Sequence, residues 1–119
     1  MIYIFLISRV LFGGYFIMNG LTHFFKLKDM TSYAHSKKVP MPKFLVIVSG
    51  LLIFLGGVGI LIGFLVPFAV LAIEIFLVFV TALMHDFWNV TDKNIRMVEY
   101  VNFTKNLALM GGALAFLFI

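Results

Sequence analysis

Residues 44–84 read FLVIVSGLLIFLGGVGILIGFLVPFAVLAIEIFLVFVTALM and contain one charged side chain, that of Glu74. A single helix of this length would be about 60 Å long, twice the roughly 30 Å thickness of the hydrocarbon core of a bilayer. The segment must therefore fold back on itself within the membrane. Gly63 is typical of a helix C-terminus and Pro67 of the first turn of the next helix. We predict helices over residues 44–64 and 67–85, joined by a short apolar turn.

The whole chain has the composition of a membrane protein. Of its 119 residues, 63% are hydrophobic and 12% are charged, whereas soluble domains are about half apolar and about a quarter charged. Two further apolar segments predict spanning helices over residues 2–25 and 101–119. The first is not expected to be a cleaved signal peptide, because it lacks a basic N-terminal region and Arg9 interrupts its apolar run. The sequence thus predicts an all-α membrane protein, a four-transmembrane-helix bundle that forms one domain over residues 1–119.

Two polar loops, residues 26–43 and 86–100, lie on the same side of the predicted bundle because two spans separate them. The first loop is expected to hold a short interfacial helix over residues 30–36. The basic side chains of the two loops are Lys26, Lys28, Lys37, Lys38, Lys43, Lys93 and Arg96. By the positive-inside rule we expect both loops in the cytoplasm and both termini outside. A nucleic-acid partner is not expected, since no basic run is long enough for a binding footprint.

Glycines recur along the predicted helices at positions that suit close helix packing. The main candidates are Gly13, Gly50, Gly57, Gly59 and Gly63. Small residues let helix backbones approach closely in lipid, where packing replaces the hydrophobic drive. The sequence leaves open whether these glycines pack helices within one chain or form the interface of a homo-oligomer.

Arg9 and Glu74 are charges in the middle of apolar segments. An intramembrane charge costs at least about 2.5–3.5 kcal/mol, so each should face the bundle and find a partner. Both lie about seven residues from the same membrane face, and we expect an intramembrane ion pair between them. In the alternative, Arg9 extends outward to the interface, and Glu74 is protonated or lines a wet cavity.

A group of polar side chains gathers where the predicted helices meet the loop-bearing side. Its members are His23, His85, Asp86, Trp88, Asn102, Lys105 and Asn106. Lys105 lies about one turn into the last predicted helix, so it needs a carboxylate or a wet cavity. Asp86 is the first candidate partner for this lysine and Glu99 is the second.

Several interpretations of this polar group stay open. A histidine with a Lys or Asn would hydrogen-bond a quinone carbonyl while Phe87, Trp88 and Phe103 contact the ring. Haem b is disfavoured because the last helix contains no histidine, and no metal site is expected because too few ligands converge. The chain has no cysteine, which excludes disulfides and cysteine-ligated iron–sulfur clusters. The alternative is a structural belt, with Trp88 at headgroup depth and Lys105 extended toward water.

The order of several segments resembles the DoxX family of small four-helix membrane proteins. These segments are SRVLFGGYFIMNGLTHFFK (8–26), YAHSKKVPMPK (33–43), SGLLIFLGGVGILIGF (49–64), MHDFWNVTD (84–92) and FTKNLALMGG (103–112). The resemblance implies a plasma-membrane protein of bacterial or archaeal type, associated with quinone-linked oxidoreductases. Many such proteins carry a Glu near the position of Ser49, and this chain has no acid there. The resemblance therefore implies no buried-acid role near Ser49 in this chain.

Three functions remain open. The first is a redox-associated membrane subunit or anchor that contacts quinone and a soluble oxidoreductase subunit at the cytoplasmic face. It would not be catalytic alone. The second is a carrier of small solutes or lipids, although residues 75–83 offer only Thr81 as a polar side chain. The third is a non-catalytic assembly partner without a ligand.

Overall fold

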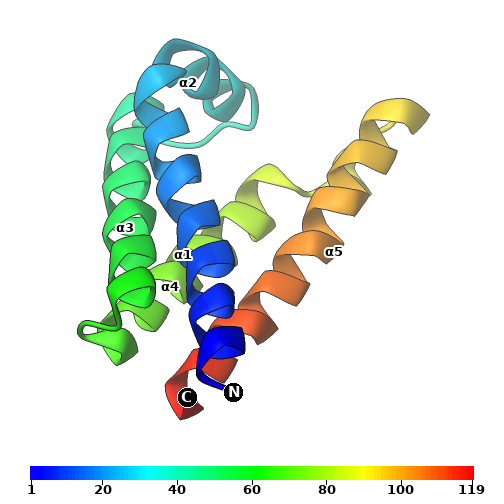
Figure 1. Ribbon diagram of the computed structural model, residues 1–119. Coiled ribbons are helices and arrows are strands. Elements are labelled where there is room, and N and C mark those ends of the chain that lie inside the picture. Colours follow the sequence, from blue (N-terminus) through cyan, green and yellow to red (C-terminus); the bar gives the residue numbers. More distant parts are fainter.

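A computed structural model describes residues 1–119, and its regular structure is entirely helical (Figure 1). The elements are α1 (Ile2–Phe25), α2 (Leu27–Ser36), α3 (Pro42–Ile62), α4 (Val66–Met84), the 3₁₀ turn η1 (Phe87–Asn89), α5 (Lys93–Ala115) and the 3₁₀ turn η2 (Phe116–Phe118). Four helices are long and apolar enough to cross a membrane: α1, α3, α4 and α5. The prediction of a bundle of four membrane-spanning helices is confirmed.

The turn between α3 and α4 forms where Gly63 and Pro67 predicted it. Gly63 ends α3 with φ +71° and its N–H donates to the carbonyl of Gly59. Leu65, also with positive φ, precedes α4, and Pro67 lies in the first turn of that helix. Gly63 supplies the left-handed conformation that ends many helices, and proline is tolerated in a first turn because its missing N–H has no partner there.

The two ends of the bundle differ in what they carry. Both termini and the α3–α4 turn lie together at one end, which we call the terminal end (Figure 1). The other end, the loop-bearing end, carries α2 and the start of α5. The prediction that the two polar loops lie on the same side is confirmed.

The last helix begins at Lys93, well before the predicted start at residue 101. The cause is an N-terminal cap, in which the Asp92 carboxylate accepts hydrogen bonds from the backbone N–H groups of Asn94 (2.9 Å) and Ile95 (3.1 Å). Such a cap satisfies backbone donors that a helix leaves free in its first turn. The polar stretch before residue 101 is therefore largely helical, and hydropathy alone does not detect its start.

Glycines bring α1 and α3 into backbone contact. A Cβ added to Gly13 would lie 2.7 Å from the carbonyl oxygen of Gly57, and one added to Gly20 would lie 2.8 Å from that of Gly50. Both distances are too short for carbon against oxygen, so these positions admit no larger side chain unless the helices separate. Gly59 similarly packs against Ala69 of α4. In this structure the glycines pack helices within one chain.

The fifth helix is joined to the rest mainly near the terminal end. The buried apolar core draws on α1, α3, α4, α5 and η2, and consists of Phe16, Ile53, Ile60, Ala69, Val70, Ile73, Leu77, Ala113 and Phe116. The ring of Phe12 packs on that of Phe116 with centroids 5.0 Å apart. Toward the loop-bearing end α5 leans away from α1 and α3 (Figure 1). Contacts that hold this half of α5 must therefore come from α2 and from the segment after α4.

Gly13→Ala should destabilise the bundle by about 1–3 kcal/mol, because the added methyl group overlaps the α3 backbone. Gly14→Ala is the matched control, since a Cβ there meets no atom within 4 Å. The control should be neutral or slightly stabilising, as alanine favours helix more than glycine does. Unfolding in mixed micelles, followed by circular dichroism, measures both. Equal stability of the two variants would contradict the proposed α1–α3 contact.

Candidate functional site

Glu99 is a carboxylate buried at the loop-bearing end, with 3% of its surface exposed. It lies on the inward face of α5, because it precedes the buried Asn106 by seven residues and the buried Ala113 by fourteen. Its Oε2 accepts a hydrogen bond from the Tyr33 hydroxyl at 2.5 Å and lies 3.0 Å from Lys37 Nζ. Its Oε1 lies 3.1 Å from His85 Nδ1. One buried charge thus joins three segments of the chain.

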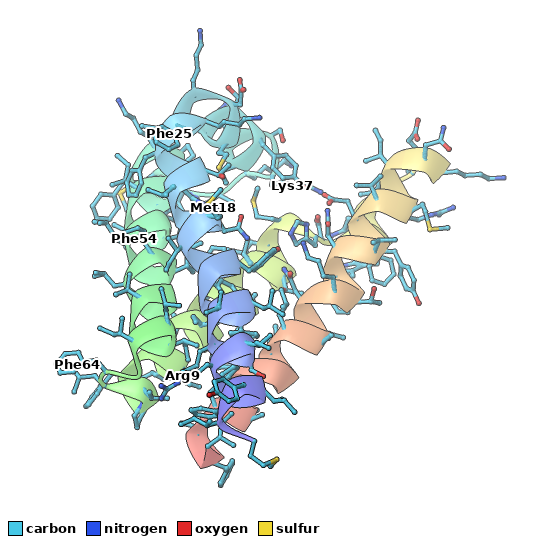
Figure 2. The ribbon with its side chains drawn as sticks, in the orientation of Figure 1. Arg9, Met18, Phe25, Lys37, Phe54 and Phe64 are labelled. Carbon is cyan, nitrogen blue, oxygen red and sulfur yellow. The ribbon has the colours of Figure 1, made fainter.

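Lys37 is the cation of this site. It follows α2 directly and its ammonium group donates to Asp86 Oδ1 at 2.7 Å, in addition to its contact with Glu99. Figure 2 shows its side chain extending from the end of α2 toward α5. We call Tyr33, Lys37, His85, Asp86 and Glu99 the loop-face cluster. A buried carboxylate is tolerated when it is paired and hydrogen-bonded in this way.

The cluster shifts the pKa values of Tyr33 and Lys37 upward. Burial raises the pKa of Tyr33, and its hydrogen bond to Glu99 and the negative charges of Glu99 and Asp86 raise it further. For Lys37, burial lowers the pKa, but hydrogen bonds to Asp86 and Glu99 and their charges outweigh burial, and the net shift is upward. At neutral pH the tyrosine is therefore a neutral hydrogen-bond donor and the lysine is a cation.

A groove of about 450 Å³ lies between α2 and α5 beside this cluster. It is lined by Tyr33, Asn94, Ile95, Val98, Glu99 and Asn102. Four of these residues are polar (Tyr33, Asn94, Glu99 and Asn102), and Ile95 and Val98 are aliphatic. The groove is open rather than enclosed, and its few polar groups beside aliphatic side chains could fix the orientation of a small molecule.

Aromatic rings fix the link between α4 and α5 next to the cluster. Phe87 of η1 packs edge-on against Trp88, Tyr100 and Phe103, with centroids 5.2–5.3 Å apart. Trp88 also packs on Phe103 at 5.8 Å and remains 56% exposed. Edge-to-face packing of this kind holds the backbone of residues 85–89 in place, and with it His85 and Asp86.

The structure brings together only part of the polar group predicted from sequence. His85 and Asp86 belong to the loop-face cluster, Asn102 lines the groove and Trp88 joins the aromatic rings. His23 and Asn106 are instead buried in the bundle interior, each with 5% exposure. His23 bonds through Nδ1 to the carbonyl oxygen of Asn19 and packs edge-on against Phe76.

The predicted partners of Lys105 were wrong. Lys105 is exposed, and the carboxylates of Asp86 and Glu99 bind Lys37 instead. Lys105 follows Glu99 by six residues, a spacing that places it on another face of α5, whereas Asn106 at a spacing of seven shares the inward face. Lys37, which does pair with these two carboxylates, was not predicted as their partner, because a loop has no periodicity from which to place a side chain.

The predicted ion pair between Arg9 and Glu74 does not form. The structure's ion pairs are confined to the loop-face cluster, and Glu74 Oε1 is buried without a hydrogen-bond partner. The Arg9 guanidinium lies 4.4 Å from the centroid of the Phe5 ring and against Gly63, at the C-terminus of α3 (Figure 2). The reason is that α1 packs on α3, so Arg9 meets the negative end of the α3 dipole rather than α4.

Tyr33 was not among the predicted site residues, and Glu99 was predicted only as a second candidate partner of Lys105. The signal for Glu99 is its heptad spacing to Asn106 and Ala113, which predicts one inward face for all three. Tyr33 offers no comparable signal. No group of three or more His, Asp or Glu side chains is arranged to hold a metal ion.

Comparison with known families matches most of the chain to one family model. The sequence model of the family described as DoxX matches residues 4–86, which is more than two thirds of the chain. The matched region begins two residues into α1, extends through the end of α4 and contains the cluster residues Tyr33, Lys37, His85 and Asp86. No curated protein and no solved structure matches the chain.

Lys37→Met should destabilise the protein by about 2–3 kcal/mol, because it leaves Asp86 and Glu99 as partly buried, unpaired charges. Lys38→Met is the matched control, since Lys38 is exposed and belongs to no ion pair. Unfolding in mixed micelles again provides the measurement. A control as unstable as Lys37→Met would show that the ion pairs carry no specific stabilisation.

Stability should also fall at alkaline pH. The folded protein raises the pKa of Lys37 and Tyr33, so their contribution is complete below the unfolded values of about 10. It is lost as pH rises through the higher folded values. We expect the free energy of unfolding to decrease above about pH 10 in the wild type and to decrease less in Lys37→Met. Identical profiles would contradict this linkage.

Proposed function

The chain belongs to the DoxX family of integral membrane proteins. On this premise, we propose that it is a redox-associated membrane subunit and that its loop-face cluster contacts the headgroup of a quinone. The observation that carries the proposal is the buried, multiply hydrogen-bonded Glu99 at the edge of a groove with aliphatic walls. The protein is not proposed to be catalytic alone.

The chemistry of a quinone headgroup suits the groups around this groove. The oxidised headgroup is a flat ring whose carbonyl oxygens accept hydrogen bonds, and the reduced headgroup carries hydroxyls that donate them. Asn94 and Asn102 supply amide donors beside the groove, and Glu99 and the oxygen of Tyr33, whose hydroxyl proton goes to Glu99, supply acceptors. Both states of the ring would therefore find partners without rearrangement of the helices.

The position of the groove suits a ligand with an apolar tail. It lies at the loop-bearing end, and Ile95 and Val98, which line it, are more than half exposed on the outer surface of α5. In a bilayer this surface faces lipid or the interface. A headgroup bound beside Glu99 would leave its isoprenoid tail among the acyl chains.

The loops around the cluster are the natural surface for a partner. Lys26, Lys28, Lys38 and Lys43 are exposed there, and the positive-inside rule favours a cytoplasmic position for this end and an external position for both termini. Reduction of a quinone needs two electrons and two protons. We propose that a soluble oxidoreductase subunit docked at this end supplies the two electrons and that water at this end supplies the two protons, while the cluster hydrogen-bonds the ring.

A second candidate function is that of an assembly subunit without a ligand. It is favoured by the exposure of Trp88 and of several lysines in the polar loops, a combination suited to a protein surface or to lipid headgroups. Purification of a soluble partner with the bundle, in the absence of quinone binding, would support this second function over the first.

Quinone binding is directly measurable because Trp88 is the only tryptophan of the chain. Titration of the purified protein in detergent with a short-chain benzoquinone should quench its fluorescence in a saturable way. Glu99→Gln and Tyr33→Phe should each raise the dissociation constant about tenfold, since each removes a hydrogen-bonding group worth about 1.4 kcal/mol or more.

Asp29→Asn is the control, because Asp29 is an exposed carboxylate of α2 outside the cluster. It should bind quinone like the wild type. Non-saturable quenching, or equal affinity in all variants, would refute the proposed site.

A further inference from the structure

Three exposed lysines lie where α1 ends and α3 begins, outside the loop-face cluster. Lys26 directly follows α1, Lys28 lies in the first turn of α2, and Lys43 lies in the first turn of α3. All three side chains are exposed, and none of them takes part in an ion pair. We call these three residues the α1–α3 lysine group.

The packing of α1 on α3 places two of these lysines at the same level of the bundle. The two helices run antiparallel (Figure 1), and a Cβ added to Gly20 would lie 2.8 Å from the carbonyl oxygen of Gly50. Because both helices rise by the same amount per residue, Lys26, six residues after Gly20, lies level with Phe44, six residues before Gly50. Phe44 is the chain neighbour of Lys43, so Lys26 and Lys43 leave two packed helices at one level.

The charge of this region is positive and is not neutralised within the protein. Residues 26–43 contain five lysines and one acid, Asp29. Of these lysines, only Lys37 is engaged, by Asp86 and Glu99. The terminal end differs, since it has no lysine. The loop-bearing end of α1 and α3 therefore needs negative charge from outside the chain.

Large apolar side chains are exposed beside the lysines. Phe25 is 82% exposed, Met41 is 66% exposed and Phe44 is 58% exposed. Figure 2 shows Phe25 at the loop-bearing end, near α2. Contact of so much apolar surface with water is unfavourable, whereas aromatic rings are enriched at the boundary between bilayer and water. These residues therefore place this end of α1 and α3 at the level of the lipid headgroups.

We propose that this end is a binding surface for anionic phospholipids, and that the α1–α3 lysine group binds their phosphate groups. The ammonium group of a lysine carries three hydrogen-bond donors and binds phosphate as a point charge. Lysines clustered directly beside a spanning helix favour anionic over zwitterionic headgroups. A lipid whose phosphate meets Lys26 or Lys43 can place its acyl chains against Phe25 or Phe44.

The exposed rings favour a lipid over an acidic protein as the occupant. A soluble acidic protein would satisfy the charges of the lysines, but it would also have to cover Phe25 and Phe44. A bilayer supplies phosphate and hydrocarbon side by side. Lys38, in the loop after α2, is not part of the surface and remains available to a soluble partner. The binding surface requires no quinone.

Lipid titration followed by native mass spectrometry tests the proposal. The purified, delipidated protein in detergent is titrated with phosphatidylglycerol, which is anionic, or with phosphatidylcholine, which is zwitterionic. The wild type should bind phosphatidylglycerol at least about tenfold more tightly, since each lysine near the headgroups contributes about fivefold. The combined variant Lys26→Gln, Lys28→Gln and Lys43→Gln should lose this preference. Its helical content should be unchanged in circular dichroism, because all three side chains are exposed and unpaired.

The matched control is the combined variant Lys38→Gln, Lys93→Gln and Arg96→Gln. It removes the same charge from exposed positions at the same end, outside the α1–α3 lysine group, and should keep the preference. An equal loss in both combined variants would show an effect of net charge alone and refute the site. Equal affinity of the wild type for the two lipids would refute lipid binding and assign the lysines to an acidic protein surface.

Discussion

The burial of one carboxylate, that of Glu99, sets the arrangement of the loop-bearing half of the molecule. A charge that is 3% exposed needs cations and donors around it, and those groups come from α2, from the residue that follows α2 and from the end of α4. Because α5 leans away from α1 and α3 here, few apolar contacts could replace them. The α2 helix, the link after α4 and the first turns of α5 are therefore positioned by one polar network.

The other half of the molecule is organised by a different constraint. There, α1 and α3 approach until backbone meets backbone at Gly13, Gly20, Gly50 and Gly57, and the apolar core fills the space toward α4 and α5. In lipid, such close packing supplies the attraction that the hydrophobic effect supplies in water. One half of the molecule is thus held together by close packing and the other by charges and hydrogen bonds, and the candidate quinone site lies in the second half.

The sequence predicted what depends on hydropathy and on backbone chemistry. The four spans, the turn at Gly63 and Pro67 and the common side of the two loops all follow from those properties. The predictions that were wrong concern the direction in which a side chain points around its helix axis. Arg9 and Glu74 were placed at similar depth, but depth does not determine which neighbour a side chain faces, and α1 presents Arg9 to the end of α3. Lys37 could not be placed at all, since it follows a helix end where periodicity stops, whereas Glu99 had a usable signal in its spacing to Asn106.

The lean of α5 also has a mechanical consequence. The helix is held near its C-terminus by the packed rings of Phe12 and Phe116 and near its N-terminus by the contacts of Glu99 with Lys37 and Tyr33. A rigid helix of about 30 Å that pivots at the ring pair would move most at its N-terminal end. A rotation of about 5° at the ring pair displaces the far end by about 2.6 Å, close to the length of a hydrogen bond. A partner that binds the short segment around Lys37 would thus need to move it only slightly to change the width of the groove between α2 and α5.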